Sequence, residues 1–150
     1  MEDAIDVRAV RAEETRGIRL AVLRPGRPRD ELIFRGDDDP ATFHAGAFVA
    51  GTLVAVGRLS REAPKGEHDD AAWRVRSMAT LPEHRNRGAG RAVLDALLEH
   101  ARERGASQVW CHARVRAVPF YERAGFGVEG DEFDLAGIGP HRFMRLRMPR

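Results

Sequence analysis

The chain has few of the residues that build covalent or metal-based scaffolds. Cys111 is its single cysteine, which excludes an internal disulfide and a cysteine-based zinc cluster. Because it lies in a short apolar run, we expect a buried and unreactive thiol. No apolar run is long enough to span a bilayer, and no N-terminal stretch has the layout of a signal peptide. We therefore expect a cytoplasmic protein with no membrane partner.

Lysine is nearly absent as well. Lys65 is the only lysine among 25 basic residues, and 23 acidic residues bring the formal net charge down to +2. Arginine binds phosphates well through its planar fork of donors. Here, however, the arginines are interleaved with acids, and they form neither a basic recognition helix nor a run mixed with aromatic residues. A nucleic-acid-binding module is thus a weak alternative, and we expect no nucleic-acid partner.

The remaining composition is that of an ordinary globular protein. Hydrophobic residues make up 43% and charged residues 32% of the 150 positions. That length suits one domain with one core, and no repeat or linker divides it. We expect residues 1–150 to form a single domain.

Periodicity and turn residues predict alternating strands and helices. Strands are expected at Ile5–Ala9, Phe43–Val49, Leu53–Leu59, Trp73–Thr80, Gln108–His112, Phe126–Phe133 and Arg142–Met148. Helices are expected at Glu13–Leu23, Arg29–Phe34, Gly88–Arg104 and Ala117–Ala124. This order predicts an α/β fold with a mixed central sheet of about six to seven strands, flanked by about four helices.

A glycine-rich turn, Arg85-Asn86-Arg87-Gly88-Ala89-Gly90, joins the strand that ends near Thr80 to the long predicted helix. Glycines let the backbone approach a ligand closely. The first helical turn leaves N–H groups without internal partners, and the positive end of the helix dipole favours anions. The carboxyl end of a central strand is also where open α/β sheets bind ligands. The turn therefore predicts a phosphate or pyrophosphate cradle.

This turn resembles the acyl-CoA signature of the GNAT superfamily of N-acetyltransferases: Gln or Arg, two residues, Gly, one residue, then Gly or Ala. A later motif of that family, an aromatic residue and Tyr, three residues, then Gly-Phe, is similar to Phe120-Tyr121 and Gly125-Phe126 here. The resemblance runs from about Trp73 to Met148. It implies the GNAT-type acyl-CoA N-acyltransferase fold in a small stand-alone enzyme of the bacterial type.

Three further positions bear on the resemblance. Gly139-Pro140-His141, before the last predicted strand, is similar to the ElaA-type stand-alone members. Thr80 stands where many members have Val. Arg114 occupies the position, seven residues before the tyrosine, where many members carry Asn.

The resemblance implies transfer of an acetyl group from acetyl-CoA to an amine by direct attack in a ternary complex, without a metal. The pyrophosphate is expected on the backbone amides of the turn, and the pantetheine arm on the preceding strand, like an added strand. A bulge in that strand, frequent in the family, would free an N–H for the thioester carbonyl. The expected cofactor-binding residues are Met78, Ala79, Thr80, Arg85, Asn86, Arg87, Gly88, Ala89, Gly90 and Arg91.

Tyr121, the only tyrosine, is the expected general acid, which would protonate the departing CoA sulfur. The candidates for the general base are His141, His112, Glu83 and Glu132. We rank His141 first because a histidine suits proton transfer near neutral pH, with a water chain as the alternative.

A metal site at His44 and Asp37-Asp38-Asp39 is disfavoured, because consecutive acids followed by proline more often form a turn or a helix start. Arg24-Pro25-Gly26 would either shape the acceptor cleft or simply end a helix. The acceptor is a small-molecule or peptide amine of unspecified identity. The sequence leaves open a monomer or a homodimer, and acyl groups longer than acetyl. The non-enzymatic alternative is an acyl-CoA-binding sensor that kept the cradle and lost the acceptor chemistry.

Overall fold

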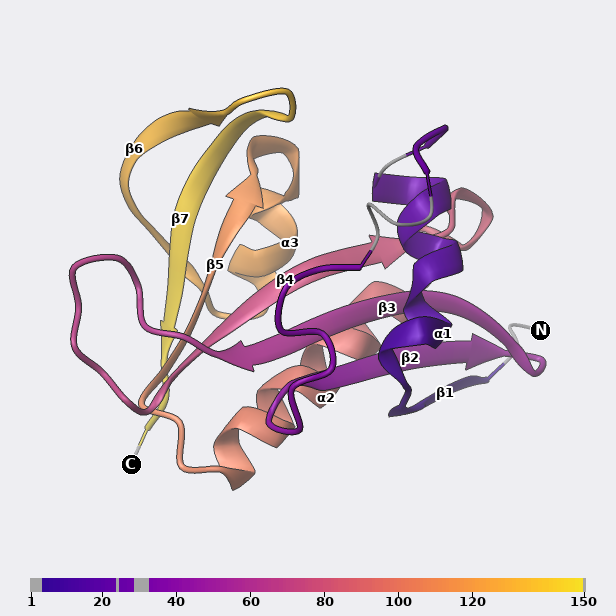
Figure 1. The fold of residues 1–150 in the computed structure, drawn as a ribbon, viewed down its shortest axis with the longest axis horizontal. Coiled ribbons are helices and arrows are strands. Elements are labelled where there is room, and N and C mark those ends of the chain that lie inside the picture. Colours follow the sequence, from indigo (N-terminus) through magenta and orange to yellow (C-terminus); the bar gives the residue numbers. More distant parts are fainter. Residues whose placement is uncertain (1–3, 24, 29–32, 150) are drawn as a thin grey trace.

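The computed structural model describes residues 4–23, 25–28 and 33–149. Within them, seven strands form one mixed sheet in the order β1-β2-β3-β4-β5-β7-β6 (Figure 1). The strands are β1 (Ile5–Ala9), β2 (Phe43–Val49), β3 (Thr52–Arg61), β4 (Ala72–Thr80), β5 (Gln108–Arg114), β6 (Gly127–Leu135) and β7 (Gly139–Arg147). Only β4 and β5 are parallel; the other neighbours are antiparallel. The predicted α/β class and strand number are confirmed.

Three α-helices occur in the described residues: α1 (Ala12–Ile18), α2 (Ala89–Glu103) and α3 (Val118–Arg123). The C-terminal part of the first predicted helix is a π-helical turn, η1 (Arg19–Leu23), and short 3-10 helices η3 (Pro82–His84) and η4 (Val115–Ala117) precede α2 and α3. About four helices were expected. The missing one, Arg29–Phe34, falls mostly outside the described residues, as does Arg24, and its last two residues are not helical.

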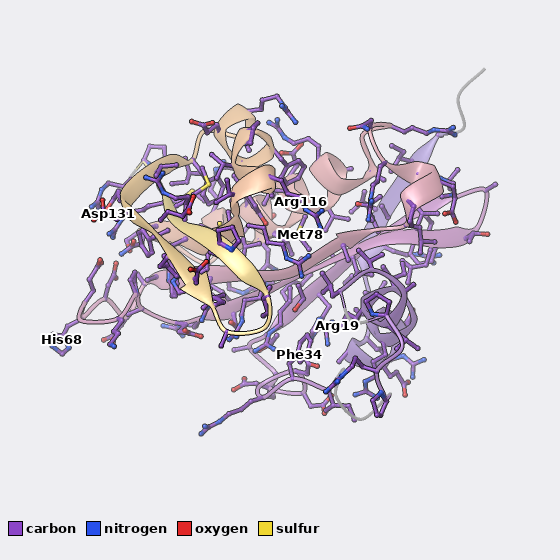
Figure 2. All side chains as sticks on the ribbon, turned by 90° about the horizontal axis from the view of Figure 1, so that it is seen from above. Arg19, Phe34, His68, Met78, Arg116 and Asp131 are labelled. Atoms are coloured by element: carbon purple, nitrogen blue, oxygen red, sulfur yellow. The ribbon has the colours of Figure 1, made fainter. Side chains whose placement is uncertain are left out.

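The two faces of the sheet are covered by different helices. α2 packs on one face through a stripe at helical spacing, and its buried apolar residues are Ala89, Val93, Leu94, Leu97, Leu98 and Ala101. α1 and η1 lie on the opposite face, where Ile18 packs with Val56 and Ala79. Figure 2 shows Met78 on the α2 side of the sheet and Arg19 and Phe34 on the α1 side. Each fully buried aliphatic side chain contributes about 1.5–3 kcal/mol relative to its exposed state.

The sheet opens in its middle. β4 and β5 pair only between 72–74 and 108–110, and beyond that point the two strands diverge (Figure 1). Residues 75–80 of β4 and 111–114 of β5 therefore have no partner across the gap. This splay divides the sheet into β1–β4 and β5-β7-β6, and it places an open edge of β4 at the start of the glycine-rich turn.

A bulge lies in β4 at the point where the splay develops. Arg58 of β3 pairs with Arg76 and Val56 pairs with Ala79, so Gly57 alone faces two residues, Ser77 and Met78. Ser77 has a φ of 58°, which is unusual for a residue with a Cβ and accompanies the kink. The bulge implied by the family resemblance is thus present.

The last strand differs from the prediction. It begins at Gly139 rather than Arg142, so Gly139, Pro140 and His141 belong to β7 instead of the loop before it. Leu135 pairs with Gly139 and Phe133 with His141, so a tight hairpin joins β6 to β7. Pro140 is tolerated because its missing N–H removes at most one bond near the end of a strand.

Candidate active site

The glycine-rich turn has the geometry of an anion cradle. Gly88 is the N-cap of α2 with a φ of 93°, a conformation that glycine adopts without strain. No side chain caps this helix. Ala92 is the first residue of α2 whose amide bonds back to Gly88, and the amides of residues 86–91 have no acceptor among the described residues. Residues 85–88 are exposed, so the unpaired amides of this turn are accessible to an anion.

The arginines of the turn are placed differently from one another. Arg85 and Arg87 are exposed, and no described acid pairs with either of them. Arg91 instead donates to the Asp95 carboxylate at 2.9 Å and to the Arg123 carbonyl at 3.3 Å, which ties α2 to the end of α3. Countercharge for a bound anion is therefore most available from Arg85 and Arg87.

The open edge of β4 can offer backbone groups to a ligand. The Leu81 amide donates to the Val54 carbonyl at 2.9 Å, so the backbone N–H of this residue points toward β3. Because backbone direction alternates along a strand, the N–H and C=O of Thr80 point the other way, toward the gap. Ala79, which precedes Thr80, buries its side chain against Ile18 and Val56 on the α1 side of the sheet.

The two sequence motifs meet in space at Gly90. A Cβ built on Gly90 would come within 3.1 Å of the Thr80 hydroxyl and 3.7 Å of the Phe120 ring. The start of α2, the end of β4 and the start of α3 are thus in mutual contact. A residue larger than alanine at position 90 would have to displace the Thr80 hydroxyl and the Phe120 ring, so the close packing favours a small residue here.

Tyr121 lies in α3 and is buried, with 6% of its surface exposed. Its ring makes edge-to-face contacts with Phe120 and Phe126, at centroid distances of 5.1 and 5.5 Å. None of the described residues forms a hydrogen bond with its hydroxyl. Burial raises the pKa of Tyr121 well above 10, and the nearby Cys111 adds to this. The phenol is therefore protonated at neutral pH.

Cys111 is buried as expected. Burial raises the pKa of its thiol to about 12, so the thiolate that would make it reactive is not formed at neutral pH.

His141 has a tautomer that suits a base. Its Nδ1 lies 2.8 Å from the Gly139 carbonyl, which can only accept, so Nδ1 carries the proton and the Nε2 lone pair is free. The residue is 4% exposed, and its ring stacks on Phe133 at 6.1 Å. It pairs in register with Arg114 at the end of β5.

His112 has the opposite tautomer. Arg74 lies 3.2 Å from its Nδ1, and a guanidinium can only donate, so the proton of the neutral ring is on Nε2. Burial, with the charge of Arg74, lowers the pKa of His112 to about 4. Nε2 is thus a donor at neutral pH, which favours a positioning role over proton abstraction. The two carboxylate candidates, Glu83 and Glu132, are exposed.

The structure does not bring Tyr121 and His141 into contact. Tyr121 belongs to the core cluster on the α2 side of the sheet, whereas His141 shares the opposite face with His112. Groups from these two faces can reach one ligand only through the gap between β4 and β5. That gap is therefore the place at which both residues could act.

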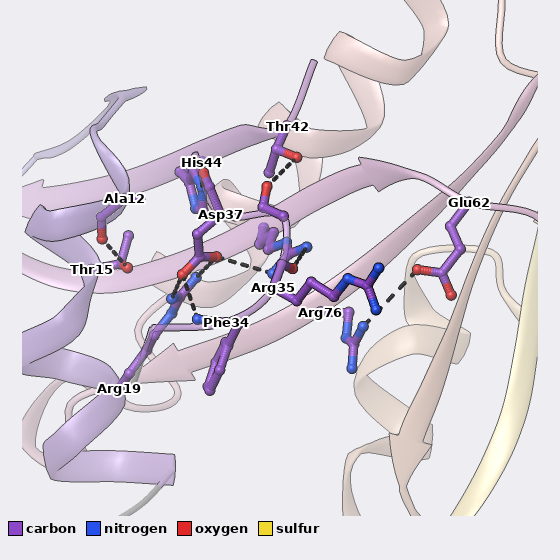
Figure 3. Close-up of polar contacts among 12 residues, drawn as sticks. Ala12, Thr15, Arg19, Phe34, Arg35, Asp37, Thr42, His44, Glu62 and Arg76 are labelled. Atoms are coloured by element: carbon purple, nitrogen blue, oxygen red, sulfur yellow. Dashed lines mark hydrogen bonds and ion pairs between the residues drawn. The ribbon is translucent and has the colours of Figure 1, made fainter. Parts of the chain in front are cut away.

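The acidic run Asp37-Asp38-Asp39 lies in turns, but Asp37 is buried, which the sequence did not suggest. Its carboxylate accepts hydrogen bonds from Arg19 at 2.7 Å and from Arg58 at 3.0 Å (Figure 3). His44 Nε2 lies 3.0 Å from the Asp37 backbone carbonyl. In the part of the chain that the structure describes, no group of three or more His, Cys, Asp or Glu is placed to hold a metal ion. Likewise, none of its helices is long and apolar enough to cross a membrane.

A split mixed sheet with a glycine-rich turn at the split agrees with the acyl-CoA N-acyltransferase fold that the sequence resembles, and comparisons with known proteins support this class. The model of the Acetyltransferase (GNAT) family matches residues 9–126. YitI of Bacillus subtilis (strain 168), described as an uncharacterized N-acetyltransferase, is 31% identical over 140 residues, which cover 93% of this chain and 94% of that protein. The chain belongs to the GNAT family of acetyltransferases, and it is an acyltransferase.

Solved structures share the fold. The ribosomal-protein-S18-alanine N-acetyltransferase from Escherichia coli superposes with a TM-score of 0.75 at 16% identity, over 96% of this chain and 94% of that chain. The structure of yncA from Salmonella typhimurium with its cofactor acetyl-CoA has a TM-score of 0.74 at 17% identity, over 97% of this chain and 94% of that chain. The comparisons confirm the family, whereas membership in the ElaA-type subgroup stays a prediction.

Proposed function

We propose that the protein transfers an acetyl group from acetyl-CoA directly to an amine bound at the same time. The observation that carries this proposal is the gap between β4 and β5. The cradle at the start of α2 and the unpaired edge of β4 both border it, and the helix that holds Tyr121 follows from the end of β5. Acetyl-CoA supplies the activated acyl group as a thioester.

The residues present fit this co-substrate. The free amides from Arg87 to Arg91 would receive the pyrophosphate, with Arg85 and Arg87 as countercharge. The exposed edge at Met78 and Thr80 would pair with the amides of the pantetheine arm. The bulge at Ser77 and Met78 would turn a backbone group of β4 toward the gap. An N–H turned in this way would stabilise the negative charge that develops on the thioester carbonyl oxygen.

Two protons must move during the reaction. Tyr121 donates its phenol proton to the sulfur as the carbon–sulfur bond breaks, so that CoA leaves as a thiol. The attacking amine loses a proton as its bond to the acetyl carbon forms. His141 Nε2, with its free lone pair, is the candidate to accept that proton, directly or through a water chain.

The test is a screen of amines for release of the free CoA thiol. Purified protein is incubated with acetyl-CoA together with one candidate amine at a time. The candidates are small amines, amino acids, aminoglycosides and peptides that have a free N-terminus. We expect thiol release that depends on both the protein and one class of amine, with an acetylated product detected by mass spectrometry. CoA binding without turnover of any amine would overturn the proposal and favour a sensor.

A further inference from the structure

Three arginines lie in a row on the face of the sheet that α1 covers. Arg58 of β3 stands directly opposite Arg76 of β4, and Arg74 precedes Arg76 by two residues on the same strand. Residues opposite each other, or two apart on a strand, share a face. Like charges directly opposite each other destabilise a sheet, so this row needs compensating anions.

Arg58 and Arg74 have such partners within the protein. Arg58 Nη1 donates to Asp37 at 3.0 Å, and its side chain is 4% exposed. Arg74 donates to the Glu62 carboxylate at 2.8 Å and to His112 at 3.2 Å, and its side chain is 14% exposed. Both guanidinium groups are therefore held in place by the fold.

Arg76 differs from its two neighbours. Its nearest described acid is Glu62, 4.0 Å from Nη1 (Figure 3). That carboxylate already accepts a hydrogen bond from Arg74. Among the described residues, none accepts a hydrogen bond from Arg76, and its side chain is 46% exposed. Burial lowers the pKa of this guanidinium, and the charge of Arg74 adds to that effect. Arg76 is thus a partly exposed cation that still has unused donors.

The position of Arg76 connects it to the chemistry. It immediately precedes the bulge at Ser77 and Met78, where β4 separates from β5. One residue along a strand spans only about 3.3 Å, so a group on Arg76 lies close to the expected place of the thioester. It approaches that place from the α1 side, opposite α2. An acceptor held by Arg76 could therefore present its amine through the gap.

We propose that Arg76 anchors a carboxylate of the acceptor, so that the enzyme acetylates amines that also carry a carboxylate. This inference rests on the proposed function. The planar guanidinium fork matches the two oxygens of a carboxylate, and a charge-assisted pair of this kind is strong where it is partly shielded from water. The neutral ring of His112 and the half-buried Phe143 and Phe133 adjoin the row and would contact an apolar part of the acceptor.

The first test compares acceptors that differ only in the charge. Each pair is an amino acid and its primary amide, such as 4-aminobutanoate and 4-aminobutanamide, or 4-(aminomethyl)benzoate and its amide. Thiol release is measured for the wild type, Arg76→Gln and the matched control Arg147→Gln. Arg147 is an exposed arginine on β7, paired with Gln108 at the closed end of the gap.

We expect the wild type to prefer the carboxylates. Arg76→Gln should raise KM for the carboxylates by about tenfold or more, because the loss of a hydrogen bond between two charged groups typically weakens binding by that factor. The KM for acetyl-CoA should stay unchanged. The amides should not respond to Arg76→Gln, and Arg147→Gln should behave as the wild type. Arg76→Gln removes a like-charge contact, so its Tm should equal or exceed that of the wild type.

The second test does not need turnover. Binding of 3-phenylpropanoate to CoA-saturated protein is followed by ligand-observed NMR. We expect saturable binding by the wild type and by Arg147→Gln, and about tenfold weaker binding by Arg76→Gln. Equal use of carboxylates and amides, or the same affinity in Arg76→Gln, would overturn the carboxylate anchor while acetyl transfer stands. If no amine is acetylated, the proposed function fails, and the binding result alone decides on Arg76.

Discussion

The Asp37 carboxylate and the Arg19 guanidinium form a buried ion pair, with 2.7 Å between Oδ2 and Nη1 and each side chain 1% exposed. The same carboxylate accepts a hydrogen bond from the Phe34 amide at 2.9 Å. These contacts join η1 to the segment before β2, on the face of the sheet that the acceptor is proposed to approach. The pair therefore holds these two segments together on that face.

Replacing Asp37 with Asn should lower the free energy of unfolding by about 3 kcal/mol, because Arg19 and Arg58 lose the carboxylate that they share in a buried site. Urea unfolding at pH 7 measures this loss. The control is Asp38→Asn on the exposed neighbour, which should change stability by less than about 0.5 kcal/mol. Equal effects of the two variants would show that the buried pair does not hold the fold.

The contribution of Asp37 should depend on pH. Burial by itself would raise the pKa of Asp37, but hydrogen bonds from Arg19 and Phe34 and the charges of Arg19 and Arg58 outweigh it and lower the pKa. A lowered pKa in the folded state stabilises the protein above the unfolded pKa, about 3.9, and this contribution is lost as the pH falls through the folded value. The stability gap between wild type and Asp37→Asn should thus be full at pH 7 and shrink below about pH 4. A gap that stays constant down to pH 3 would contradict this assignment.

Gly88→Glu should weaken CoA binding by at least about tenfold relative to Gly88→Asn. Both variants place a Cβ at a φ of 93°, so both carry the backbone strain of about 1 kcal/mol, which Asn tolerates best. Only the glutamate also sets a negative charge against the pyrophosphate. Titration calorimetry gives the two affinities, and circular dichroism checks that both variants fold. The same affinity in both would place the pyrophosphate elsewhere.

Tyr121→Phe should lower kcat by about 10²-fold or more and leave the Kd for CoA nearly unchanged, because the hydroxyl would act only when the sulfur departs. The fold should tolerate the change, since no described residue depends on that hydroxyl for a hydrogen bond and the ring contacts with Phe120 and Phe126 remain. Steady-state thiol release and thermal unfolding measure the two quantities. Full activity in Tyr121→Phe would remove the general acid from the mechanism.

The local signals in the sequence were sufficient for the order of strands and for the glycine turn at which α2 begins. The apolar stripe of α2 and the glycines at its start are short-range patterns, and each forms where it was expected. The buried state of Asp37 could not be found in this way, because it depends on Arg19 and Arg58, which are 18 and 21 residues away. The run of three acids has the pattern of a solvated turn. The pairing of Arg58 with Arg76 likewise depends on strand register, which the bulge shifts.

Gly57 is the residue of β3 that faces the bulge, and its missing side chain makes room for that bulge. A Cβ there would come 2.4 Å from the Met78 sulfur, 2.9 Å from Val93 and 3.1 Å from Leu97. Gly57→Ala should therefore destabilise the protein by about 1–3 kcal/mol and also lower kcat, because Met78 and the strand around it must shift. The control is Gly17→Ala in α1, where nothing lies within 4 Å of the added Cβ.

That control should stabilise the protein by about 0.5–1 kcal/mol, since alanine restricts the unfolded chain and favours the helix. Urea unfolding and thiol release on both variants separate the two effects. If Gly57→Ala lost stability but kept the wild-type kcat, the shape of the bulge would matter for packing and not for the reaction. If Gly57→Ala kept both the stability and the kcat of the wild type, the close contacts of the added Cβ with Met78 and Val93 would be contradicted.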